Sequence, residues 1–269
     1  MEKIKQALDR ARSLNESRDD LKFHPRLKDE QASIQTITYT QTKSIELNLE
    51  ELRQKRILIG DTNDIISDQY KVLRTQVIQR MNKNNWKTLA ISSPTEECGK
   101  TLTSINLCVS IAKDVNQSVM LVDMDLRRPN VHEYFYKHNK LGISDYINGD
   151  EALKDILFNP GLDRFVILPG NETIADSSEM LSSPRMRELV NEVKSRYQNR
   201  FIVFDMPPLL SCDDMLAFSP QIDAIMLVIE EGVTSKQDLK RSYDLIDKNK
   251  ILGVVLNKSL DATSKTSYY

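Results

Sequence analysis

The spacing of hydrophobic positions along this chain changes near residue 63. From about residue 21 to that point the sequence is polar, rich in Thr, Gln and Lys, and without a sustained period. After it, apolar side chains recur every three or four residues, as at Ile66, Tyr70 and Leu73, which is the period of an amphipathic helix. Beyond this helix, short apolar runs of strand length alternate with further segments of helical period.

The apolar runs predict the strands of one sheet. They cover residues 88–92, 119–123, 164–168, 201–205, 224–229 and 251–256. Ser183 followed by Pro184 marks the start of one intervening helix, because a capping side chain precedes a proline that fits the first helical position. This alternation predicts an α/β fold, in which a mostly parallel sheet carries helices on both faces.

We expect three parts along the chain. Residues 1–60 would form an N-terminal amphipathic helix and a polar linker or arm, in which residues 57–60 could add a short strand. Residues 61–258 would form the α/β domain. Residues 259–269 would form a flexible polar tail that closes in two adjacent tyrosines.

The composition limits the classes of function. A formal net charge of -2 and a pI near 6.0 give no global attraction to nucleic acid. The three cysteines are scattered without a Cys-x-x-Cys pair, which suits a reducing cytosol and no disulfide framework. Every apolar run is far shorter than the ~20 residues of a membrane helix, and the N-terminus lacks the apolar segment of a secretory signal. We therefore expect a cytoplasmic protein that reaches a membrane only through a partner.

The first predicted strand runs into a loop that ends in Gly99, Lys100 and Thr101, and a helix follows. A strand, a loop, a Gly-Lys-Thr and a helix in this order are the setting of a phosphate-binding loop. Backbone amides would hold the phosphates, Lys100 would neutralise β- and γ-phosphate oxygens, and the Thr101 hydroxyl would ligate magnesium. The expected nucleotide-binding residues of this loop are Cys98, Gly99, Lys100, Thr101 and Leu102.

Two positions of this loop depart from the standard pattern. Glycine is usual where this chain has Pro94 and where it has Glu97. Carboxylates of Glu96 and Glu97 beside a polyphosphate cost electrostatic energy unless they point into water. Taken alone, the loop fits an ordinary strand–helix turn equally well.

Aspartates at the ends of two further strands favour the nucleotide site. Asp123 and Asp125 close the second predicted strand, and Asp205 closes the fourth, where two prolines stiffen the exit. The carboxyl ends of parallel strands meet at one edge of a sheet, where open α/β folds bind ligands. We expect Thr101, Asp123 and Asp205 to hold magnesium there, with Lys100 beside them on the phosphates.

Several stretches resemble the bacterial protein-tyrosine kinases of capsule and exopolysaccharide assembly, and most of all the exosortase-associated tyrosine autokinases. These stretches are residues 4–11, 105–107, 121–129, 179–184, 204–208 and 253–258. The family derives from the deviant-Walker-A P-loop ATPases, so the resemblance implies a P-loop fold with ATP and Mg²⁺ as cofactors. It implies Asp123 as the base for the attacking tyrosine, Asp125 as its companion and Asp205 as a magnesium residue. Asn257 would lie at the nucleotide's base pocket or, as an open alternative, cap a turn.

The same resemblance implies an assembly. Members of the family carry C-terminal tyrosines that are phosphorylated in trans within a ring of subunits, and Tyr268 and Tyr269 would take that role here. The ring contact would use Asp68, Lys71 and Arg74, although Lys71 lacks the bidentate fork of the family's arginine. The implied partners are a membrane chain-length-determinant protein (a polysaccharide co-polymerase) at the inner membrane and a cognate tyrosine phosphatase, with no nucleic acid.

Two other functions compete with a tyrosine autokinase. The first is a partitioning-type ATPase switch without kinase activity, but such proteins carry a signature lysine where this loop has Thr95, Glu96 and Glu97. The second is a degenerate, non-catalytic nucleotide-binding scaffold. Glu96, Glu97 and the missing glycines are the features that favour this second alternative.

Overall fold

The computed structural model describes residues 43–44, 48–60, 64–114, 116–136, 141–149, 151–195 and 200–259. The helix expected near the N-terminus lies outside these residues, and so do Tyr268 and Tyr269 of the expected tail.

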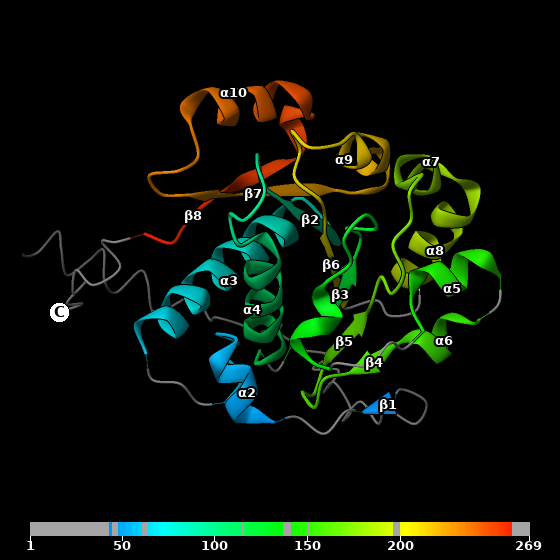
Figure 1. The fold of residues 1–269 in the computed structure, drawn as a ribbon. Coiled ribbons are helices and arrows are strands. Elements are labelled where there is room, and N and C mark those ends of the chain that lie inside the picture. The colour runs from blue at the N-terminus through cyan, green and yellow to red at the C-terminus, as the bar shows by residue number, and fades with distance from the viewer. Residues whose placement is uncertain are drawn as a thin grey trace, which may run out of the picture. The chain divides into compact units, whose positions relative to one another are not determined.

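An eight-stranded sheet, in the order β1-β4-β5-β3-β6-β2-β7-β8, forms the centre of the domain (Figure 1). The strands are β1 (Lys43–Ser44), β2 (Thr88–Ser92), β3 (Ser118–Asp123), β4 (Phe158–Asn159), β5 (Phe165–Leu168), β6 (Arg200–Asp205), β7 (Ala224–Glu230) and β8 (Ile251–Asn257). Among the described strands, only the β4–β5 pair is antiparallel. The predicted mostly parallel sheet is confirmed, and each apolar run named above forms one of its strands.

Helices connect these strands. They are α2 (Leu49–Gln54), α3 (Ile65–Lys83), α4 (Lys100–Ala112), α5 (Ile143–Asn148), α6 (Leu153–Ile156), α7 (Ser177–Ser182), α8 (Pro184–Ser195), α9 (Asp214–Phe218) and α10 (Lys236–Leu245). Short 3-10 turns occur at η1 (Val131–Tyr134), η2 (Ser219–Gln221) and η3 (Lys248–Lys250).

Side chains alternate across the sheet, so each central strand contributes to two hydrophobic cores. On β2, Leu89 and Ile91 belong to the core that includes α3 and α4, while Ala90 belongs to the core that includes α7 to α10. The sheet therefore lies between two groups of helices, which confirms the expected coverage of both faces (Figure 1).

Capping side chains start two of the predicted helices. The Asp64 carboxylate accepts the Ser67 amide at 2.6 Å at the start of α3. Along the apolar stripe of α3, Val77 and Met81 are buried and Tyr70 and Leu73 are half-buried, while Ile66 is exposed. The Ser183 hydroxyl accepts the Met186 amide at 3.1 Å, and α8 begins at Pro184. The start predicted at Ser183 and Pro184 is confirmed.

The strand expected at residues 57–60 is wrong. Ile57 and Ile59 are buried, so the apolar alternation is real, but the backbone between them does not pair with a strand. The Leu58 amide donates instead to Asn106 Oδ1 at 2.9 Å, and Asn106 Nδ2 donates to the Arg56 carbonyl at 3.0 Å. A side chain of α4 thus satisfies the backbone groups that a sheet would otherwise pair.

Helix α2 precedes this segment and is capped by the Asn48 side chain, which accepts the Glu50 amide at 3.1 Å. Its Leu52 is buried in the same core as Ile57. Within the described residues, the helices are too short or too polar for any of them to traverse a lipid bilayer.

Candidate active site

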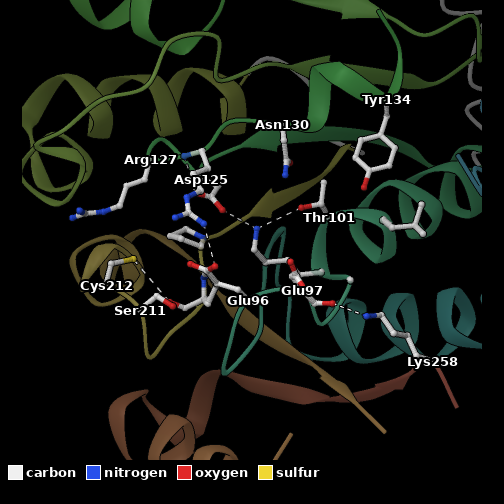
Figure 2. A pocket seen from close by; sticks show the side chains of 16 residues that line it. Glu96, Glu97, Thr101, Asp125, Arg127, Asn130, Tyr134, Ser211, Cys212 and Lys258 are labelled. Carbon is white, nitrogen blue, oxygen red and sulfur yellow. Dashed lines mark hydrogen bonds and ion pairs between the residues drawn. The ribbon is translucent and has the colours of Figure 1, made fainter. Parts of the chain in front are cut away.

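A cavity of about 610 Å³ opens where β2, β3 and β6 end, at the carboxyl edge of the sheet (Figure 2). It is lined by Glu96, Glu97, Gly99, Lys100, Thr101, Leu102, Asp125, Arg127, Arg128, Asn130, Tyr134, Pro207, Pro208, Ser211, Cys212 and Lys258. Figure 2 shows Arg127 and Cys212 at one end and Tyr134 and Lys258 at the other, with Thr101 and Asp125 between them. The edge predicted to bind a ligand therefore carries a cavity.

The loop between β2 and α4 has the shape of an anion cradle. Gly99 has a left-handed φ of 82°, and a Cβ there would collide with the Asn257 side chain, so only glycine fits. Because Gly99 has no side chain to cap α4, the first amides of the helix are available to an anion. These features fit a phosphate group above Lys100.

Lys100 lies between two carboxylates. Its Nζ is 2.8 Å from Asp125 Oδ2 and 3.8 Å from Asp205 Oδ2. Burial lowers the pKa of Lys100, but the charges of Asp205 and then Asp125 outweigh it and raise that pKa above its usual value. Lys100 is therefore protonated at any physiological pH, as a phosphate ligand must be.

Asp205 is held by α4. Its carboxylate accepts the Thr101 hydroxyl at 2.6 Å and the Ser104 hydroxyl at 2.9 Å. Burial raises the pKa of Asp205, and Lys100 and the two hydroxyls oppose the rise. The predicted Thr101–Asp205 association is present, while Ser104 was not predicted, although it stands one helical turn after Lys100.

Asp123 is fully buried beneath the cavity and is not among its lining residues. Its carboxylate accepts the Val131 amide at 2.9 Å and the Asp125 amide at 3.3 Å. Burial, followed by the charge of Asp205, raises the pKa of Asp123 to about 8. Of the two acids at the end of β3, Asp125 lines the cavity and Asp123 does not.

The donor set fits magnesium that arrives with a nucleotide. The described residues contain no cluster of three or more His, Cys, Asp or Glu side chains that would hold a metal alone. Mg²⁺ in phosphate-transfer sites typically keeps several waters and takes few protein ligands besides phosphate oxygens. A hydroxyl and a carboxylate 2.6 Å apart, from Thr101 and Asp205, meet that requirement.

Cations from outside the loop contact Glu96 at its carboxylate and Glu97 at its backbone carbonyl. Arg128 Nη1 is 3.1 Å from Glu96 Oε2, and Lys258 Nζ is 2.8 Å from both the Glu97 carbonyl oxygen and Glu230 Oε2 (Figure 2). Glu97 itself has a left-handed φ of 62°. The glycine that the standard pattern places here would adopt that conformation without strain.

Two of the expected nucleotide-binding residues lie under the loop. Asn257 Nδ2 donates to the Cys98 carbonyl at 2.8 Å, and neither residue lines the cavity. Cys98 is buried, and its sulfur lies 3.5 Å from the Thr95 hydroxyl. Asn257 thus ties the end of β8 to the turn before Gly99.

The three residues expected at a ring contact are engaged within the chain. Lys71 Nζ is 2.8 Å from Asp68 Oδ1 on the surface of α3. Arg74 Nη1 donates to the Ser110 carbonyl on α4 at 3.0 Å. Arg74 therefore also links the two helices.

Sequence reasoning missed a buried carboxylate beside the cavity. Asp214 is fully buried at the start of α9 and accepts hydrogen bonds from Arg127 and from the Ser177 hydroxyl. Asp213 and Asp214 read as polar loop residues, and the only signal was an acidic pair soon after the two prolines that follow β6.

A family model described as an AAA domain matches residues 86–261, which is more than half of the chain. The chain belongs to the AAA domain family. The match begins just before β2 and includes every cavity residue named above. The predicted P-loop ATPase membership is thereby confirmed.

Relatives of this AAA domain chain are named as tyrosine kinases. Tyrosine-protein kinase YwqD of Bacillus subtilis is 28% identical over 221 residues, which cover 81% of this chain and 92% of the relative. The solved kinase domain of the Escherichia coli tyrosine kinase ETK has a TM-score of 0.68 at 24% identity, covering 84% of this chain and 93% of that one.

The septum site-determining protein MinD of Pyrococcus horikoshii, solved with Mg-ADP, shares the fold at a TM-score of 0.52 and 23% identity. It covers 63% of this AAA domain chain and 69% of its own. The resemblance to bacterial tyrosine kinases is confirmed, and these comparisons support a kinase over a partitioning ATPase.

Proposed function

We propose that this chain is an ATP-dependent protein-tyrosine autokinase that works with Mg²⁺. One observation carries the proposal, which is the convergence of Lys100, Thr101, Asp125 and Asp205 around the anion cradle at Gly99. The names of the sequence relatives support a tyrosine as acceptor. Bound Mg-ATP would supply the phosphoryl group and neutralise its oxygens.

The residues of the cavity would position the phosphates. Lys100 would exchange its contact with Asp125 for phosphate oxygens, and the amides at the start of α4 would hold the same group. Thr101 and Asp205 would hold the magnesium. Phosphoryl transfer needs this positioning and charge neutralisation more than a covalent intermediate.

Asp123 would accept the proton of the acceptor hydroxyl, as the resemblance implies. A carboxylate with a pKa near 8 is a stronger base than an ordinary one, but only in its ionised form, which bound Mg²⁺ would favour by lowering this pKa. The role requires Asp123 to exchange a hydrogen bond from a backbone amide for one from the acceptor. Asp125, which faces the cavity, would bind Lys100 until the phosphates of the nucleotide take the place of the Asp125 carboxylate.

The acceptors would be Tyr268 and Tyr269 of a neighbouring subunit in a ring. Phosphorylation adds charge to these tails and would weaken the ring, so cycles of assembly and separation would regulate polysaccharide polymerisation and export. We further propose a membrane chain-length-determinant protein as the partner that brings this cytoplasmic kinase to the inner membrane. A cognate tyrosine phosphatase would reset the tails.

Labelling with ATP tests the proposal. The full chain, incubated with labelled ATP and Mg²⁺, should acquire alkali-stable label, and a Lys100→Met variant should not. A Tyr268→Phe/Tyr269→Phe variant should lose the label, while Tyr243→Phe on α10 should keep it. Label that persists in the double variant would remove the acceptor assignment.

A non-catalytic scaffold remains the second candidate, because Glu97 occupies a position where glycine is usual and adopts a left-handed φ of 62°. Calorimetry with ADP and Mg²⁺, read together with the labelling, separates the two, and the absence of detectable binding also favours the scaffold. Micromolar binding together with label supports the kinase, and binding without any label supports the scaffold.

A further inference from the structure

The buried carboxylate of Asp214, outside the proposed phosphate site, binds the guanidinium of Arg127 at the end of the cavity. Asp214 Oδ1 accepts Arg127 Nε and Nη2, each at 3.2 Å, and Asp214 Oδ2 accepts the Ser177 hydroxyl at 2.7 Å. The Asp214 side chain is fully buried, whereas that of Arg127 is 42% exposed. A buried charge is costly unless it is paired, so this carboxylate fixes the guanidinium in one orientation.

Arg127 is held from one side only. Within the described residues, its contacts with Asp214 and Asp213 use Nε and Nη2 and leave Nη1 unused. Arg128, the next residue, instead pairs with Glu96 at 3.1 Å. Arg127 therefore presents a fixed cation with remaining donor capacity toward the cavity.

The position of Arg127 separates two cavities. A second cavity of about 570 Å³ shares Arg127, Arg128 and Asn130 with the nucleotide cavity. Figure 2 shows Arg127 at the end of the nucleotide cavity opposite Tyr134 and Lys258. A nucleotide with its phosphates at Lys100 would fill the first cavity, so a polypeptide acceptor would reach those phosphates past Arg127.

The second cavity has polar groups suited to a polypeptide. Asn130 Oδ1 and Asn171 Oδ1 are buried there without a hydrogen-bond partner in the part of the chain that is described, and backbone amides of an acceptor are natural donors. Glu133 and Glu172 also line this cavity. Of the two arginines that line this cavity, Arg128 is paired with Glu96, so an anionic group on the acceptor is favoured next to Arg127.

We propose that Arg127, positioned by Asp214 and Ser177, forms a subsite for an anionic residue next to the acceptor tyrosine. This inference rests on the proposed kinase function. Guanidinium binds carboxylate and phosphate through the same paired geometry, so the residue is a glutamate, an aspartate or a phosphotyrosine. Adjacent tyrosines such as Tyr268 and Tyr269 would then be modified in sequence, because the first phosphate creates the anion that the subsite binds.

Peptide acceptors that differ at one position test the subsite. Three peptides would carry a single acceptor tyrosine preceded by glutamine, glutamate or phosphotyrosine, and kcat/KM would be measured with the full chain. We expect the wild-type protein to prefer each anionic peptide over the glutamine peptide by about tenfold. Comparison of kcat/KM for the glutamate peptide and the phosphotyrosine peptide shows whether the subsite prefers a carboxylate or a phosphate.

Variants then locate the preference. Asp214→Asn should reduce the preference to about twofold or less, because the neutral amide no longer orients Arg127, and Arg127→Gln should abolish it. Asp213→Asn is the matched control, because the Asp213 side chain is 68% exposed and its Oδ1 lies 3.8 Å from Arg127 Nη2, which is a weak contact. It should keep the tenfold preference.

The outcomes separate this inference from the function on which it rests. Phosphorylation of all three peptides at equal efficiency would overturn the subsite and leave the kinase intact. A preference that survives in Arg127→Gln would also overturn it. Because this substitution leaves the buried Asp214 carboxylate without its cation, unchanged efficiency of the variant on the glutamine peptide is required as the folding control. Failure of the wild-type protein to label any peptide or itself would overturn both proposals.

Discussion

Glu97 adopts a backbone conformation that side chains other than glycine resist. Its φ of 62° is left-handed, which costs an L-residue roughly 1–2 kcal/mol. We expect Glu97→Gly to exceed Glu97→Ala in free energy of unfolding by about 1 kcal/mol, because both remove the charge and only glycine removes the strain. Urea unfolding without nucleotide measures the difference.

The neighbouring residue provides the control. Glu96 is not among the described residues with positive φ, so Glu96→Gly should be less stable than Glu96→Ala. If the glycine and alanine variants have the same order of unfolding free energy at both positions, the left-handed φ of Glu97 does not lower the stability of the protein.

Asp123 makes the stability of the protein depend on pH. Its pKa is about 8 in the folded protein against 3.8 for the ordinary side chain. Between these values the unfolded chain has released the proton and the folded protein retains it. Wild-type stability therefore falls as pH rises from about 4 to about 8. Asp123→Asn removes this loss, so the variant should gain several kcal/mol over wild type at pH 8 and little at pH 4.

Urea titrations in EDTA at pH 5 and pH 8 measure this gain. Asp163→Asn, at an exposed aspartate, should behave like wild type at both values. A gain from Asp123→Asn that is equal at pH 5 and pH 8 would contradict the raised pKa. The same variant should lose autophosphorylation if Asp123 is the base.

At the scale of elements, the end of β8 clamps the phosphate loop. Asn257 Nδ2 holds the Cys98 carbonyl, and Lys258 Nζ holds that of Glu97. Loss of one such hydrogen bond costs roughly 0.5–1.5 kcal/mol. We expect Asn257→Ala to weaken Mg-ADP and Mg-GDP by the same factor, about 3–10-fold, since both nucleotides use the same loop.

Calorimetry with both nucleotides checks this expectation, and Asn249→Ala on η3 is a control that leaves the loop untouched. A loss confined to Mg-ADP would instead give Asn257 the base-pocket role that the resemblance implies.

Helices and strands were predictable from the sequence where a single local pattern determines them. β2 has the bounds expected, because a five-residue apolar run between polar residues is too short for a helix and has the length of a buried strand. β1 and β4 have two residues each and exist through pairing with distant segments, which no local period reports. At residues 57–60 the same alternation as in a strand was present, but its partner was the side chain of Asn106.

The site divides in the same way. Lys100, Thr101 and Asp205 lie in motifs whose spacing carries the chemistry, and the structure brings them together. Asp214 lies in no motif, and 87 residues separate it from Arg127 along the chain. The packing of α9 against α7 brings Asp214 to the Ser177 hydroxyl, and the tertiary fold places Arg127 beside both.

For the whole molecule, α3 is the surface on which the proposed ring would assemble. Its outer face exposes Ile65 and Val72. Ile65 lies one helical turn before Asp68, and Val72 lies one turn after it. A neighbouring subunit that covered these two side chains would remove their apolar surface from water, which favours association. We expect Val72→Lys to raise the dissociation constant of the assembly at least tenfold, with Leu245→Lys, exposed on α10, as the control.

Sedimentation velocity at several protein concentrations measures this assembly. A mass distribution that is unchanged by Val72→Lys would move the proposed contact away from α3.

The ion pair between Lys100 and Asp125 has a kinetic consequence. Before nucleotide arrives, Lys100 already lies 2.8 Å from Asp125 and 3.8 Å from Asp205, so one cation faces two carboxylates, and Arg128 is paired with Glu96. The empty entrance thus exerts little long-range pull on a triphosphate. Capture rates should then vary weakly with ionic strength, and the incoming divalent ion, more than the protein's own field, would draw the ligand in.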